Sequence, residues 1–128
     1  MAAKKILVVD NEEYIQEVTK ICLESTTKWQ VITASSGLEG IKKAEIEKPD
    51  AILLDVMMPG MDGITVFKHL QENSDTKEIP VIILTATIQT SDNYRYKDLG
   101  IKAAIGKPFS PLTLAQEISQ ALGWEDDK

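Results

Sequence analysis

Five short apolar runs alternate with longer amphipathic stretches along the chain. The runs cover residues 6–9, 31–34, 51–54, 81–84 and 103–105. The runs are continuously apolar rather than alternating between apolar and polar residues, except that the weaker run 31–34 contains a threonine. This pattern is typical of strands that are covered on both faces of a sheet. We therefore expect five short, buried strands.

The stretches between the runs have the spacing of amphipathic helices. Apolar residues recur every three or four positions in four of these stretches, a period that places them on one helix face. The expected buried faces consist of Ile15, Val18 and Cys22; of Leu38, Ile41 and Ala44; of Ile64, Phe67 and Leu70; and of Leu114, Ile118 and Ala121. The stretch 92–99 is mostly polar and is followed by a glycine, which predicts a short, weakly packed fourth helix.

Several helix ends can be expected from local signals. The acidic pair Glu12 and Glu13 suits a first helical turn, where negative charge is favourable. Pro49 marks a stop for the second helix. For the last helix we expect Ser110 as N-cap, Pro111 at the first helical position and Gly123 as the stop.

A strand followed by a helix, five times over, predicts an α/β fold with a doubly wound parallel sheet and right-handed crossovers. The chain has 128 residues, a length that suits one domain with a core of its own. No linker, repeat or low-complexity stretch is present. We therefore expect a single domain over residues 1–128 without an output domain.

The composition excludes several classes of function. A formal net charge of −6 argues against direct binding to nucleic acid, which requires clustered Lys and Arg. The apolar runs are too short to cross a bilayer, and the N-terminus lacks the apolar segment of a signal peptide. Cys22 is the single cysteine, so no internal disulfide can form, and we expect it to be a buried packing residue. These features predict a cytoplasmic protein without membrane association.

Polar residues stand where the apolar runs end, and they are the candidates for chemistry. Asp10 and Asn11 follow the first run, Asp55 the third and Thr85 the fourth, while Lys107 lies shortly after the fifth. In open parallel sheets, ligands bind beyond the carboxyl ends of the strands, so these side chains should converge. A cluster of carboxylates suits a hard cation such as Mg²⁺. A carboxylate can also act as a nucleophile toward phosphorus.

Four segments in order, ILVVDNEE, ILLDVMMPGMDG, VIILTAT and IGKPFSPLTL, resemble the receiver domains of two-component response regulators. The resemblance covers essentially the whole chain. It implies a flavodoxin-like receiver fold with strand order 2-1-3-4-5, in which Asp55 is the phosphoacceptor, Thr85 the switch hydroxyl and Lys107 the phosphate-contacting cation. It also implies that Mg²⁺ is held by Asp10, Asn11, Asp55 and the backbone carbonyl of Met57.

The same resemblance implies the partners. Family receivers catalyse their own phosphorylation from a phosphohistidine on a sensor histidine kinase or a phosphotransfer protein. We therefore expect self-catalysed phosphorylation and dephosphorylation only, and no enzyme activity on other substrates. The signal is expected to leave through the surface of the fourth helix, fifth strand and fifth helix, toward a downstream effector protein or a second copy of the chain.

Two positions depart from the family pattern. The usual acidic pair reads Asp10–Asn11, so an amide replaces a carboxylate at the position that is typically a direct metal ligand, and one negative charge is lost. Ala104 stands where many receivers carry an aromatic residue that turns inward on activation. Asp10 and Asn11 are also good helix N-caps in their own right, Thr85 suits a strand by its β-propensity, and Lys107 suits a solvated surface.

Three other functions remain open. A haloacid-dehalogenase type of hydrolase would carry a second Asp two residues after the nucleophile, where this chain has Met57, which cannot transfer protons. A flavodoxin-like cofactor binder would need a phosphate-cradling loop after the first strand, where this chain has Asp10, Asn11, Glu12 and Glu13. A degenerate receiver would act as a phosphorylation-independent protein-interaction module, and Asn11 is the feature that favours it.

Overall fold

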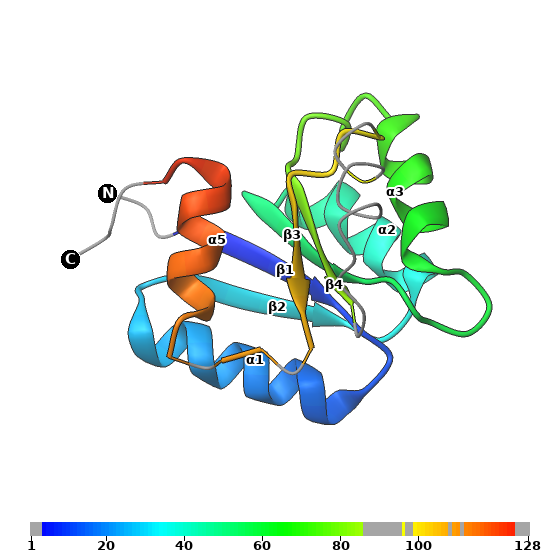
Figure 1. The fold of residues 1–128 in the computed structure, drawn as a ribbon. Coiled ribbons are helices and arrows are strands. Elements are labelled where there is room, and N and C mark those ends of the chain that lie inside the picture. Colours follow the sequence, from blue (N-terminus) through cyan, green and yellow to red (C-terminus); the bar gives the residue numbers. More distant parts are fainter. Residues whose placement is uncertain (1–3, 86–95, 97–98, 108, 111, 125–128) are drawn as a thin grey trace.

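The computed structural model describes residues 4–85, 96, 99–107, 109–110 and 112–124. Five strands form one parallel sheet in the order β2-β1-β3-β4-β5, as predicted. The strands are β1 (Lys5–Val9), β2 (Gln30–Ala34), β3 (Ala51–Asp55), β4 (Val81–Thr85) and β5 (Ala103–Gly106) (Figure 1). Strands β3 and β4 are buried along their whole length, because helices cover both faces of the sheet.

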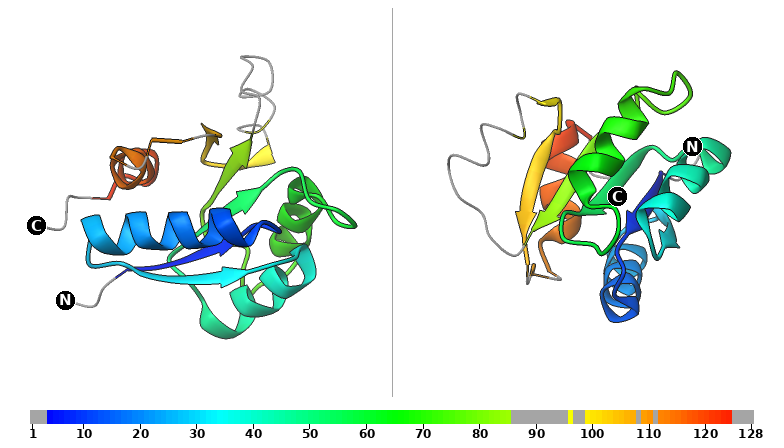
Figure 2. Two further views of the ribbon diagram at one scale, coloured as in Figure 1. Left: turned by 90° about the horizontal axis from the view of Figure 1, so that it is seen from below. Right: turned by 90° about the vertical axis from the view of Figure 1, so that its right-hand side faces the viewer.

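Among the described residues, two pairs of helices cover the two faces of the sheet (Figures 1 and 2). The first pair is α1 (Glu13–Thr26) and α5 (Leu114–Leu122), and the second is α2 (Gly37–Glu47) and α3 (Gly63–Gln71). The expected fourth helix at 92–99 lies almost entirely outside the described residues. No described helix is long and apolar enough to cross a membrane.

Alternate residues of each strand point into two separate cores. Ile6, Leu53 and Ile82 pack under α1 and α5, against side chains such as Leu23 and Ile118. Their strand neighbours Leu7, Ile52 and Ile83 pack under α2 and α3. This arrangement explains why the strands are continuously apolar in sequence, and it fixes the pairing register, since a slip of one residue would exchange the two faces.

The buried face of α1 differs from the expected one. Gln16, Thr19, Cys22 and Leu23 are buried, whereas Ile15 and Val18 are only half-buried. Cys22 is therefore the packing residue that we expected. Compared with the expected face, the face of α1 that meets the sheet is shifted toward Gln16 and Thr19. The apolar period misplaced the face because the amide of Gln16 is buried for its hydrogen bonds, described below, and not for its hydrophobicity.

The buried face of α2 is likewise shifted, in this case toward glycine. Gly37, Gly40 and Ala44 are buried, while Leu38 is 57% exposed. A Cβ added at Gly40 would lie 2.8 Å from a methyl group of Val9, closer than side chains pack. The helix lies so close to the sheet that only glycine fits, and a pattern of large apolar residues does not reveal this contact.

Most helix ends were predicted correctly, but the start of α5 was not. Helix α2 ends before Pro49, and Gly123 ends α5 with a left-handed backbone conformation (φ 71°). Helix α5 begins at Leu114, with Thr113 rather than Ser110 at the N-cap. The carbonyl of Ser110 instead accepts the N–H groups of Thr113 and Leu114, each at 3.1 Å, so its backbone forms a turn before the helix.

Candidate functional site

The candidate site lies where the strands end at the carboxyl edge of the sheet. Asp10 directly follows β1, Asp55 and Thr85 are the last residues of β3 and β4, and Lys107 directly follows β5. The parallel register brings these ends side by side, because Asp55 pairs with Leu84 and Thr85 pairs with Gly106. The backbone N–H of Lys107 also donates to the carbonyl of Thr85 at 2.8 Å.

One lysine bridges the two carboxylates. Lys107 Nζ lies 2.8 Å from Asp10 Oδ2 and 3.3 Å from Asp55 Oδ1. Both aspartates are buried, at 0% and 3% exposure. Buried charges are tolerated only when they are paired, so the ammonium group is needed to hold the two carboxylates together. The structure thus brings together three of the residues predicted from sequence.

The loop after β3 positions Asp55. The backbone N–H of Met57 donates to Asp55 Oδ1 at 3.3 Å, and the N–H of Gly63 donates to the carbonyl of Val56 at 2.9 Å. A Cβ added at Gly63 would lie only 2.5 Å from the backbone oxygen of Asp55. Glycine at this position therefore lets the start of α3 approach the residue that carries the carboxylate.

Asp10 is held through its side chain and its backbone. Its Oδ1 accepts a hydrogen bond from the N–H of Glu12 at 2.9 Å, which fixes the turn before α1. Its backbone N–H donates to the carbonyl of Ala34 at 3.0 Å. Its carbonyl accepts Nε2 of Gln16 at 2.6 Å. The N-cap of α1 is Glu12, so the alternative that Asp10 or Asn11 caps this helix is wrong. The metal-binding role of Asp10 stays a prediction.

The electrostatics of the site favour a positive charge beside Asp55. Burial, and then the nearby charge of Asp10, raise the pKa of Asp55 above its ordinary value, although Lys107 and the N–H of Met57 act in the opposite direction. Burial tends to lower the pKa of Lys107, but the hydrogen bond and charge of Asp10, together with the charge of Asp55, outweigh it and raise this pKa. Lys107 therefore remains charged at neutral pH.

The other predicted residues lie around this cluster. Thr85 is buried at the end of β4, next to the backbone of Lys107. Asn11 is exposed and directly follows Asp10. The side chain of Met57 is 74% exposed, while its backbone N–H contacts Asp55. The metal-binding roles of Asn11 and of the Met57 carbonyl, and the switch role of Thr85, stay predictions.

The residues present fit a divalent cation such as Mg²⁺. Carboxylate, amide and backbone carbonyl oxygens are the ligands that hard cations prefer. The position of the Lys107 ammonium shows that a positive charge is accommodated between Asp10 and Asp55. Within the described residues, however, no three His, Cys, Asp or Glu side chains gather into a metal-binding group. This follows from Asn11, which leaves two carboxylates at the edge.

Sequence reasoning missed Gln16 as a member of the site. It is polar, only 8% exposed and hydrogen-bonded to the backbone of Asp10. A polar residue beside the expected apolar face, six residues after a candidate ligand, was the available signal. Gly63, the first residue of α3, was not identified either, because its close approach to Asp55 depends on tertiary packing.

A doubly wound sheet with paired carboxylates and a lysine at its carboxyl edge defines the class as a flavodoxin-like domain with an acidic site. The model of the response regulator receiver domain matches residues 6–119, and the chain belongs to this family. The alkaline phosphatase synthesis transcriptional regulatory protein PhoP of Bacillus subtilis (strain 168) is 47% identical over 108 residues. That match covers 84% of this chain and 44% of PhoP, and the chain spans about half the length of the curated relatives it matches.

Solved receiver structures show the same fold. The Vibrio cholerae chemotaxis protein CheY4 superimposes with a TM-score of 0.86 at 30% identity, covering 94% of this chain and 99% of that protein. The receiver domain of the sensor histidine kinase PA1611 from Pseudomonas aeruginosa PAO1 superimposes with a TM-score of 0.82 at 26% identity, covering 95% and 99%. That structure contains a magnesium ion coordinated in its active site cleft.

Proposed function

We propose that this receiver domain is a phosphoacceptor switch in which Asp55 takes a phosphoryl group in a Mg²⁺-dependent reaction. The observation that carries the proposal is the contact of Lys107 Nζ with Asp10 at 2.8 Å and with Asp55 at 3.3 Å, at the carboxyl edge of the sheet. This arrangement presents one buried carboxylate beside a fixed cation. A phosphoryl group on that carboxylate would bring its charged oxygens to the same place.

The donor is a phosphohistidine of a sensor histidine kinase or a phosphotransfer protein. A carboxylate oxygen of Asp55 forms the new P–O bond while the P–N bond to the donor imidazole breaks. The electron pair of that bond stays on the imidazole nitrogen, which then takes up a proton. We infer that the domain catalyses this transfer to its own Asp55, with Lys107 and Mg²⁺ beside the carboxylate, and that it turns over no other substrate.

The surrounding side chains have separate roles. Lys107, held protonated by its neighbours, offsets the charge of the phosphoryl oxygens. The hydroxyl of Thr85 donates a charge-assisted hydrogen bond to a phosphoryl oxygen. Asp10, Asn11, Asp55 and the carbonyl of Met57 would hold Mg²⁺, which would further neutralise the charge of the phosphoryl group. The Pseudomonas receiver domain, which has magnesium coordinated in its active site cleft, supports the choice of the cation.

The test is to incubate the protein with Mg²⁺ and acetyl phosphate and to measure the intact mass. We expect a single phosphoryl adduct in the wild type and none in Asp55→Asn. Asp75→Asn is the matched control, because Asp75 is an exposed carboxylate remote from the cluster. An adduct at wild-type level in Asp55→Asn would refute the assignment.

The same experiment addresses the degenerate-receiver alternative. The amide at Asn11 and the missing third carboxylate are the observations that favour it. A wild-type protein that forms no adduct, with Mg²⁺ present, would support a protein-interaction module that works without phosphorylation.

For the output we propose a surface that includes β5 and α5 and the segment 92–99, which lies outside the described residues. The occupant is a downstream effector protein or a second copy of the chain. Supporting this, β5 is an edge strand that pairs only with β4 in the described sheet, and Ala104 on it is partly exposed. Amide exchange with and without a phosphoryl mimic tests the proposal, and changes confined to α1 would contradict it.

A further inference from the structure

Gln16 lies on the face of α1 that packs against the sheet, and its buried side chain reaches the ends of two strands. Its Nε2 donates to the carbonyl of Asp10 at 2.6 Å and to Ser35 Oγ at 3.1 Å, and it lies 3.5 Å from the carbonyl of Ala34. Two of these three partners are carbonyls, which can only accept hydrogen bonds. The amide must therefore direct its NH₂ group toward them, so its orientation is determined.

The carbonyl of Asp10 belongs to the peptide that joins Asp10 to Asn11. A peptide unit is planar, so fixing the direction of its carbonyl also fixes the direction of the N–H of Asn11. The next N–H, that of Glu12, donates to Asp10 Oδ1 at 2.9 Å. The turn is thus fixed on one side by the carboxylate of Asp10 and on the other by the amide of Gln16.

We propose that Gln16 is a positioning residue for the cation site: its buried amide fixes the peptide before Asn11, while Asp10 Oδ1 holds the N–H of the peptide after it, and together they set the backbone of Asn11 and the direction in which its side chain points. This inference rests on the proposed function, because it assigns Asn11 to the Mg²⁺ shell. The side chain of Asn11 is a neutral amide, so it attracts the cation less strongly than a carboxylate would. Its contribution to Mg²⁺ affinity therefore depends more on where its oxygen is placed. Groups that orient metal ligands typically change affinity tenfold or more when they are removed.

The central variant is Gln16→Met, which keeps the length of the side chain and removes its donor. We expect Mg²⁺ binding, measured by calorimetry, to weaken by about tenfold. In the metal-free protein, we expect faster hydrogen exchange at the N–H of Glu12. Thr76→Val is the matched control, since it also removes a buried hydrogen bond from a side chain to a backbone carbonyl (Thr76 Oγ1 to Leu70 O, 2.7 Å), and it should change neither quantity.

A double-mutant cycle distinguishes positioning from general destabilisation. If Gln16 acts through Asn11, Gln16→Met should change Mg²⁺ affinity by less than about twofold in an Asn11→Ala background. An unchanged affinity in Gln16→Met, or the same loss in both backgrounds, would overturn the proposal. Should Gln16→Met not fold, Gln16→Glu keeps the size and loses the donor when ionised, and wild-type exchange at Glu12 in that variant would overturn it.

The outcomes separate this inference from the proposed function. A wild type that binds Mg²⁺ but forms no adduct on Asp55 refutes the phosphoacceptor assignment, while the binding and exchange comparisons still decide the role of Gln16. A wild type that binds no Mg²⁺ overturns the positioning role together with the cation site.

Discussion

At the scale of single residues, Thr19 carries an unfavourable group. Its Oγ1 is the one buried side-chain oxygen or nitrogen without a hydrogen-bond partner in the part of the chain that the structure describes. Burying an unpaired hydroxyl costs about 1–3 kcal/mol, and valine has nearly the same shape without the hydroxyl. Thr19→Val should therefore increase the free energy of unfolding in urea by about 1 kcal/mol.

Thr76 provides the opposite case for the same substitution. Its buried hydroxyl donates to the carbonyl of Leu70 at 2.7 Å. Thr76→Val should therefore decrease the free energy of unfolding by about 1 kcal/mol. Changes of the same sign in the two variants would show that the hydrogen-bond state of the hydroxyl does not determine the effect.

The ionised side chain of Asp55 should decrease the free energy of unfolding at neutral pH. Burial and the charge of Asp10 raise its folded-state pKa above the ordinary 3.8, so the folded state binds the proton more tightly than the unfolded state. The contribution of Asp55 thus favours folding below pH 3.8 and is lost as the pH rises through the folded pKa. Asp55→Asn should be more stable than wild type at pH 7, and the difference should shrink on acidification. Urea unfolding at several pH values measures it, and a difference that grows toward low pH would contradict the sign.

Asn11 allows a gain of function at the cation site. Asn11→Asp restores the charge that the pair lacks, on an exposed side chain where solvent screens part of the effect. We expect Mg²⁺ to bind about fivefold more tightly, which corresponds to about 1 kcal/mol. Calorimetry measures the change, and Ser74→Asp adds the same charge at an exposed position after α3 as a control. Unchanged or weaker binding in Asn11→Asp would remove this residue from the metal shell.

The convergence of Asp10, Asp55 and Lys107 was predictable because each stands at a strand end, and parallel strands bring such ends to one edge. Gln16 was not predictable in the same way. Its burial depends on which backbone carbonyls lie beneath α1, and that depends on the packed arrangement of β1, β2 and the helix.

At the scale of elements, the start of α3 determines how close a helix lies to the acceptor. A Cβ at Gly63 would lie 2.5 Å from Asp55 O and 2.9 Å from Val56 Cα, and backbone cannot move away as a flexible side chain can. Gly63→Ala should therefore decrease the free energy of unfolding by about 1–3 kcal/mol and slow formation of the phosphoryl adduct.

Gly123→Ala is the control for Gly63→Ala. Gly123 has a positive φ of 71°, and a Cβ added there would meet open space. Gly123→Ala should therefore decrease the free energy of unfolding by about 1 kcal/mol, from backbone strain alone. Its rate of phosphorylation should match the wild type. A wild-type rate of phosphorylation in Gly63→Ala would show that the close approach of α3 does not affect the reaction at Asp55.

Strands were easier to predict than helix faces, and the reason is physical. Each expected strand differs from the observed one by at most one residue at either end, because apolar runs mark the segments that helices cover on both faces. The expectation of five buried strands was wrong for β2 and β5, which lie at the edges of the sheet and are only partly buried. Helices α1 and α2 approach the sheet through Gln16 and through Gly40. Such contacts depend on hydrogen bonding and close approach, which a count of apolar residues does not capture.

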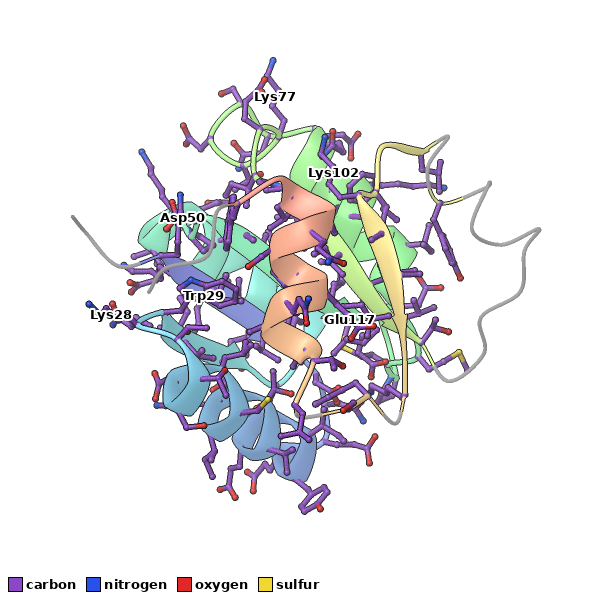
Figure 3. All side chains as sticks on the ribbon, turned by 60° about the vertical axis from the view of Figure 1, so that its left-hand side comes forward. Lys28, Trp29, Asp50, Lys77, Lys102 and Glu117 are labelled. Carbon is purple, nitrogen blue, oxygen red and sulfur yellow. The ribbon has the colours of Figure 1, made fainter. Side chains whose placement is uncertain are left out.

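At the scale of the whole molecule, the two tryptophans lie at the opposite end from the site. Trp29 precedes β2, whose first residue pairs with the first residue of β1, and it lies beside α5 (Figure 3). Its ring packs edge to face with Trp124, with centroids 5.3 Å apart, and Lys4 Nζ lies 4.9 Å from the ring of Trp124. The site lies beyond the other end of five-residue strands, about 16 Å away.

Tryptophan fluorescence should therefore report unfolding but not occupancy of the site. Mg²⁺ binding and phosphorylation change charges beside Asp10 and Asp55, whereas the Trp29–Trp124 pair is separated from them by the length of the packed sheet. We expect a Mg²⁺ titration that saturates by calorimetry to leave the emission spectrum unchanged, while urea shifts it in a single transition. Trp124→Phe, which keeps an aromatic ring against Trp29, is the control that assigns the signal. An emission change that follows the calorimetric curve would show instead that occupancy of the site alters the packing at the far end of the sheet.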